Sequence, residues 1–157
     1  MNKFIYTLII PFITIQGIAL SHCQVPCGIY DDTLRIVQIK EDFKTIRKAM
    51  DQINQLSIKT NPLSSNQLNR WVITKEQHAT NIQKIVSEYF LTQRVKADKS
   101  QKYIDQTTTL QQVLVTAMKC KQTVDESNVD RGIQLVDSFV FYYFDGHGLE
   151  HIIKLSE

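Results

Sequence analysis

The chain has 157 residues, of which 43% are hydrophobic and 22% charged, and this balance excludes a disordered or collagen-like protein. A formal charge of +2 gives no support for a nucleic-acid binder, which normally carries a clustered basic surface. Five glycines and three prolines favour long helices over a turn-rich β fold, and three cysteines are too few for a disulfide scaffold. We therefore expect one domain after a short processed segment, with no nucleic acid among its partners.

Residues 1–21 have the three parts of a secretory signal peptide. A lysine supplies the positive charge, residues 4–20 read FIYTLIIPFITIQGIAL, and Ala-Leu-Ser provides the small-x-small site. A membrane anchor is the alternative, but it needs about 20 apolar residues, and Pro11 interrupts this run. Cleavage after Ser21 is expected to leave residues 22–157 as a secreted or lumenal chain that no longer contacts a membrane.

The segment that follows the cut, residues 22–30, reads HCQVPCGIY and is called the hook below. The new α-amine, the deprotonated backbone amide of Cys23 and the thiolates of Cys23 and Cys27 form a planar set of two nitrogens and two sulfurs. The imidazole of His22 is available as an axial ligand, and Pro26 helps to make the turn that brings the second sulfur back. Square-planar nitrogen donors favour Ni(II) or Cu(II), whereas zinc prefers a tetrahedron. Because the α-amine exists only after proteolysis, we expect processing and metal loading to be linked.

Three other interpretations of the hook cysteines stay open at this point. The cysteines form a small disulfide, they supply part of a zinc site, or they are ordinary thiols. No second cysteine pair is available to complete a zinc site. The feature that favours the planar metal site is the His-Cys pair directly behind the predicted cut.

Four amphipathic stretches follow, with apolar residues recurring at steps of three and four. Their apolar positions span residues 33–56, 68–90, 103–118 and 129–143. Short connections between such helices predict an all-α, up-down-up-down four-helix bundle over residues 31–157. We expect Asp31 and Asp32 at the N-cap of the first helix and a loop over residues 60–66 with a capping box of Ser64 and Gln67.

The hook resembles the nickel hook of the nickel-containing superoxide dismutases, through the pattern His22-Cys23-x-x-Pro26-Cys27-Gly28-x-Tyr30. The segment WVITKEQ at residues 71–77 resembles a second-helix segment of that family, and SEYF at residues 87–90 resembles its acidic-Tyr-Phe segment. The three matches occur in the family's order, and the chain after about residue 123 matches only as a helical pattern. The resemblance implies an enzyme that disproportionates superoxide to dioxygen and hydrogen peroxide.

The resemblance also implies a site. It implies one nickel ion per subunit, held by His22, Cys23 and Cys27 and cycling between Ni(III) and Ni(II). Tyr30 and Tyr89 would flank the open face of the metal, where superoxide approaches, and hold ordered water there. Family members assemble as hexamers with each hook against neighbouring subunits, so a homohexamer is expected. The alternatives are a secreted nickel- or copper-binding protein without turnover, and a disulfide-tied helical oligomer that binds no metal.

The chain departs from the resembled family at the support of the axial histidine. Well-known members carry a glutamate in the first helix and an arginine after Lys-Glu-Gln, where this chain has Val37-Gln38 and His78. Gln38 and His78 are therefore the candidates to replace that support, which sets ring orientation and ligand basicity.

The remaining reactive residues have ordinary interpretations. Cys120 is expected to be a structural or unpaired thiol, and Lys75 and Glu76 a solvated face. His147 and His151 have a spacing that suits a metal, but two histidines near a chain end are more often solvated.

Overall fold

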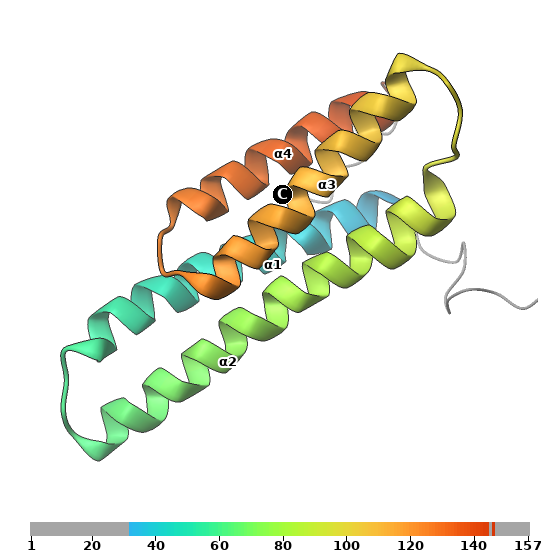
Figure 1. The fold of residues 1–157 in the computed structure, drawn as a ribbon. Helices are drawn as coiled ribbons and strands as arrows, with labels where there is room; N and C mark the ends of the chain where they lie inside the picture. Colours follow the sequence, from blue (N-terminus) through green and yellow to red (C-terminus); the bar gives the residue numbers. More distant parts are fainter. Residues whose placement is uncertain (1–31, 145, 147–157) are drawn as a thin grey trace, which may run out of the picture.

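The computed structural model describes residues 32–144 and 146, and these form an all-helical bundle (Figure 1). Its elements are α1 (Asp32–Ser57), α2 (Pro62–Lys84), the π-helix η1 (Ile85–Arg94), α3 (Gln101–Gln122) and α4 (Ser127–Tyr143). Within these described residues there is no strand, and no helix is long and apolar enough to cross a membrane. The prediction of an all-α four-helix bundle is confirmed.

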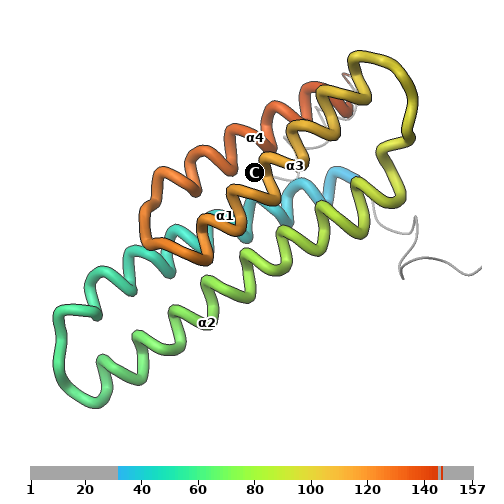
Figure 2. Tube along the Cα trace, in the orientation of Figure 1, coloured from blue at the N-terminus to red at the C-terminus, as the bar shows by residue number. Residues whose placement is uncertain are grey.

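Successive helices run in opposite directions, as the tube in Figure 2 shows. α1 packs against α2 and α4, and α3 packs against the same two helices. The start of α1, the end of η1, the start of α3 and the end of α4 therefore lie at one end of the bundle (Figure 2). Because the hook directly precedes α1 in the sequence, we call this the hook end.

An apolar core runs the length of the bundle and is richest in aromatic rings toward the hook end. Phe90 and Phe139 are fully buried, with ring centroids 5.1 Å apart in an edge-to-face contact. The ring of Tyr143 stacks on Phe139 at 5.0 Å and meets Phe90 edge-on at 5.8 Å. Burying one such ring stabilises the fold by about 1.5–3 kcal/mol, so these contacts hold the end of α4 against η1.

α1 and α4 approach each other closely at Gly132. A Cβ atom at this position would lie 2.3 Å from Cε1 and Cζ of Phe43. Phe43 is fully buried, so its ring has no open space into which to move. Glycine at position 132 therefore permits this helix pair to pack.

α2 begins earlier than its sequence pattern indicated. The predicted loop over residues 60–66 and the capping box of Ser64 and Gln67 are wrong, because the helix starts at Pro62. Asn61 is the cap: its Oδ1 accepts a hydrogen bond from the backbone N–H of Ser64 at 2.9 Å. Proline suits the first helical position, where its missing N–H has no intrahelical partner to lose.

η1 continues α2 but has the wider turn of a π-helix. The N–H of Val95 donates to the carbonyl of Phe90, five residues back, at 2.8 Å. The side-chain hydroxyl of Thr92 likewise donates to a carbonyl five residues back, that of Ser87, at 2.6 Å. π-Helices are rare and occur frequently at functional sites, and this one lies at the hook end.

Candidate functional site

Tyr89, a predicted site residue, lies in η1 at the hook end and is only 3% exposed. The guanidinium carbons of Arg35 and Arg94 each lie 5.3 Å from the centroid of its ring. Phe90 meets the same ring edge-on at 5.2 Å. The aromatic ring is therefore held by α1 and by η1 together, which fixes its orientation.

Asp32, the first residue of α1, receives three donors at this end of the bundle. The Tyr89 hydroxyl donates to Oδ1 at 2.5 Å, and Nε of Arg94 donates to the same oxygen at 2.7 Å. The Tyr143 hydroxyl donates to Oδ2 at 2.7 Å. Hydrogen bonds to an ionised carboxylate are roughly twice as strong as neutral ones. One carboxylate thus joins α1 to η1 and α4, and we call these four residues the Asp32 cluster.

Burial and the Asp32 carboxylate make both tyrosines weaker acids. Burial, followed by the hydrogen bond to Asp32, raises the pKa of Tyr89 to about 12. The same two causes raise the pKa of Tyr143 above its ordinary value. The hydrogen bond to Asp32 likewise raises the pKa of Arg94. At neutral pH both phenols therefore keep their protons and Arg94 is a cation.

A pocket of about 280 Å³ borders the Asp32 cluster and shares Arg94 and Tyr143 with it. Lys96, Lys102 and Asp98 also line this pocket. Counting Asp32, which pairs with Arg94, three cations face two carboxylates, and this small positive excess attracts small anions. Because the whole chain carries a formal charge of only +2, such attraction is local to the hook end.

Farther along α1, Asp42 forms a second polar cluster with α2. The Asp42 carboxylate is 5% exposed; Nδ1 of His78 lies 2.6 Å from one oxygen, and Nδ2 of Asn81 donates to the other at 2.6 Å. Burial raises the pKa of Asp42, and the two hydrogen bonds oppose this effect without overcoming it. Gln38 has a different partner, since its Oε1 accepts from Nη1 of Arg35 at 2.9 Å. Gln38 and His78 are thus bound to separate partners in the bundle, and their predicted support of His22 stays a prediction.

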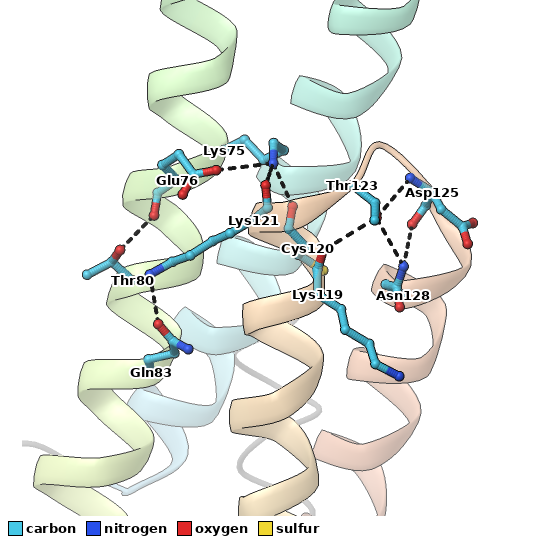
Figure 3. Close-up of polar contacts among 10 residues, drawn as sticks. All are labelled: Lys75, Glu76, Thr80, Gln83, Lys119, Cys120, Lys121, Thr123, Asp125 and Asn128. Carbon is cyan, nitrogen blue, oxygen red and sulfur yellow. Dashed lines mark hydrogen bonds and ion pairs between the residues drawn. The ribbon is translucent and has the colours of Figure 1, made fainter.

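Lys75 is buried, so the prediction that it lies on a solvated face is wrong. Figure 3 shows its polar contacts. Its Nζ donates to the carbonyl of Cys120 at 2.7 Å and to the carbonyl of Lys121, both in the last turn of α3. The last carbonyls of a helix have no intrahelical donor, and a cation there also complements the helix dipole. Lys75 therefore ties α2 to the end of α3, away from the hook end.

Cys120 is a buried free thiol, as its solitary position predicted. Burial raises the pKa of this thiol to about 11. Because the thiolate is the reactive form, Cys120 is unreactive at neutral pH.

The other predicted site residues and the two C-terminal histidines lie outside the described residues; they are His22, Cys23, Cys27, Tyr30, His147 and His151. Across residues 32–144 and 146, no group of three or more histidines, cysteines and acidic residues could hold a metal ion.

Residues 17–146 match the family of nickel-containing superoxide dismutases, and this range includes both the hook and all the described helices. The chain belongs to that family. It is accordingly a nickel-dependent oxidoreductase that converts superoxide to dioxygen and hydrogen peroxide. The chain matches no curated protein and no solved structure.

The donors of the hook suit the nickel ion of this superoxide dismutase. Cys23 and Cys27 offer soft thiolates, and His22 offers an imidazole and, after processing, an α-amine. Thiolate, imidazole and amine donors of this kind suit late first-row metals such as nickel. The residues present therefore fit the metal that the family implies.

Sequence reasoning missed three members of the Asp32 cluster in this superoxide dismutase. Asp32 was predicted only as a helix cap, Tyr143 only as part of an apolar stripe, and Arg94 was not singled out. The available signal for Asp32 was its position just behind the hook. Arg94 had none, because its approach to Asp32 depends on the π-helical turn.

Proposed function

We propose that this chain disproportionates superoxide at the hook, where His22, Cys23 and Cys27 hold one nickel ion per subunit after cleavage behind Ser21. The observation that supports the proposal is the family match over residues 17–146, a range that includes residues 22–30. When bound, nickel supplies the one-electron chemistry that oxidises one superoxide and reduces a second.

The hook residues have separate roles in this proposal. Cys23 and Cys27 provide electron-rich sulfur, which makes a higher oxidation state accessible at a biological potential. His22 would provide an imidazole nitrogen and, in a processed chain only, the α-amine.

Tyr30 and Tyr89 flank the open face of the metal and hold water there. The Tyr89 phenol, with its pKa of about 12, stays neutral, so it adds no negative charge that would repel superoxide. The cations that line the pocket at the hook end draw the anion toward this face. Superoxide is therefore attracted to the hook end by cations, and the Tyr89 phenol adds no charge there.

The processed enzyme is proposed to be a secreted or lumenal homohexamer. Native mass spectrometry of the protein purified from its own source reads the N-terminus, the nickel content and the subunit number together. Expected is a chain that begins at His22 and carries one nickel in a six-subunit particle. A metal-free chain two hydrogens lighter would indicate a Cys23–Cys27 disulfide and contradict the proposal.

A pair of histidine variants tests the site. His22→Ala should abolish superoxide consumption and weaken nickel retention, because the imidazole is lost while the α-amine and both thiolates remain. His147→Ala, the matched control near the other end of the chain, should retain both. Nickel binding without superoxide consumption in the wild type would instead mean that the hook only stores metal.

A further inference from the structure

Asp32 is the first residue of α1 and lies at the hook end of the bundle. Its carboxylate is the common acceptor for side chains from two other helices. Three donors converge on it, two from η1 and one from α4. The Tyr89 and Tyr143 bonds join residues 57 and 111 positions away, so the cluster forms only when the bundle is folded. Asp32 also carries the chain directly into the hook.

The π-helical turn of η1 brings two of these donors to one oxygen. Tyr89 and Arg94 are five residues apart, and both reach Oδ1 of Asp32. The guanidinium of Arg94 also lies 5.3 Å from the centroid of the Tyr89 ring. Asp32 therefore fixes both the phenolic oxygen of Tyr89 and the cation beside its ring.

Chain length limits how far the hook can lie from this point. An extended chain spans at most about 3.6 Å per residue, so the Cα of Cys27 lies within about 18 Å of the Cα of Asp32. The Cα of Tyr30, two residues away, lies within about 7 Å by the same limit. Whatever holds Asp32 in place therefore limits where the hook sulfurs can lie relative to Tyr89.

We propose that Asp32 is a positioning residue of the nickel centre, which orients Tyr89 and ties the first turn of α1, two residues behind the hook in the sequence, to η1 and α4. This inference rests on the proposed function of the hook. A carboxylate that accepts from three donors holds its backbone in one geometry, and a prearranged ligand set binds metal more tightly than one that must be ordered on binding. Groups that orient metal ligands typically change metal affinity by about 10–100-fold when they are removed.

Asp32→Asn tests the proposal, because its amide nitrogen cannot accept a hydrogen bond and at least one of the three donors loses its acceptor. Nickel affinity, measured at pH 7 by competition with a chelator, should weaken by about 10–100-fold. Asp130→Asn is the matched control, since Asp130 also pairs with an arginine, Arg47, but near the start of α4 at the opposite end. An Asp32→Asn chain with wild-type nickel affinity overturns the proposal.

A second measurement tests the Asp32 cluster in the absence of metal, through the titration of its tyrosines. In the metal-free full-length processed chain, the ultraviolet absorption of tyrosinate should show that part of the tyrosine titration is delayed to near pH 12, as the pKa of Tyr89 requires. Asp32→Asn should move that part toward the ordinary value near pH 10, whereas Asp130→Asn should leave it in place. A tyrosine titration that stays at the wild-type pH in Asp32→Asn also contradicts the proposal, because burial alone would then account for the whole delay.

Tyr143→Phe keeps the test decisive if Asp32→Asn fails to fold. It removes one donor without changing a charge, and Tyr142→Phe is its neighbouring control. Tyr143→Phe should weaken nickel binding several-fold, and unchanged affinity would overturn the proposal.

The Cys27→Ser variant, which removes a hook thiolate, separates failure of this inference from failure of the proposed function. If wild-type and Cys27→Ser chains bind nickel equally, the hook is not the site, and the proposal about Asp32 falls with it, even where the tyrosine titration behaves as expected. If only the wild type binds nickel, and Asp32→Asn matches it, the positioning role alone is wrong.

Discussion

Two charged side chains, Asp32 and Lys75, join separate helices in different parts of the bundle. Asp32 collects donors from η1 and α4, and Lys75 donates to the last carbonyls of α3. In both cases the charged group is matched by several hydrogen bonds, which is the condition for placing a charge out of water. Removing either charged side chain should therefore weaken the packing between helices more than it lowers the helical content.

Lys75→Met should lower the free energy of unfolding by about 1–3 kcal/mol, because the carbonyls at the end of α3 lose their donor. Urea denaturation measures this change, and the helical content of the folded protein should stay the same. Lys84→Met is the control, since Lys84 is exposed on the same helix. Equal stability of the two variants would show that the buried ammonium contributes nothing net.

The beginning of α2 and the turn of η1 are properties of whole elements. α2 starts with the pair Asn61-Pro62, in which the asparagine caps the helix and the proline opens it. η1 ends the same continuous helix with a wider turn, which places Tyr89 and Arg94 together on Asp32. The start of α2 is therefore decided by two neighbouring residues, whereas η1 is held by contacts to other helices.

Asn61→Ala should destabilise the protein by about 1 kcal/mol, because the N–H of Ser64 loses its acceptor. Thermal unfolding followed by circular dichroism measures the change. Asn66→Ala, an exposed substitution one turn into the same helix, should be neutral or slightly stabilising because alanine has the higher helix propensity. If Ser64→Ala destabilises the protein more than Asn61→Ala does, the result would contradict the Asn61 cap and support the capping box of Ser64 and Gln67.

At the scale of the whole molecule, the buried phenols and the buried thiol link stability to alkaline pH. The pKa of Tyr89 is raised from 10.0 to about 12, and that of Cys120 from 9.0 to about 11. In each case the folded state favours the protonated form. This contribution to stability is complete below the unfolded-state pKa and is lost as the pH rises through the folded-state value.

The free energy of unfolding should therefore decline between about pH 9 and pH 12, with about 1.4 kcal/mol for each unit of pKa difference. Urea denaturation at successive pH values measures the decline. Tyr143→Phe should make it shallower, because the raised pKa of Tyr143 contributes to it, and Tyr142→Phe should leave it unchanged. A flat profile from pH 8 to pH 12 would contradict these folded-state pKa shifts.

The sequence by itself determined the helices and the family, and it predicted the chemistry of the hook. Apolar periodicity and a donor set such as the His-Cys pair are local patterns, complete within a few residues, so they can be recognised without a fold. The same locality explains the one helix start that was misplaced, since two capping patterns, one at Asn61 and one at Ser64, lie three residues apart.

Only the tertiary structure decided which residues far apart in the sequence meet inside the bundle. Asp32 meets partners 57 and 111 positions away, and Lys75 meets the carbonyl of Cys120 45 positions away. Such long-range contacts depend on how the helices pack. The contact of Arg94 also depends on a π-helical turn, which the pattern of apolar residues does not predict. A carboxylate in a first turn and a lysine beside a glutamate look solvent-exposed in a sequence, and it is the packing of neighbouring helices that buries them.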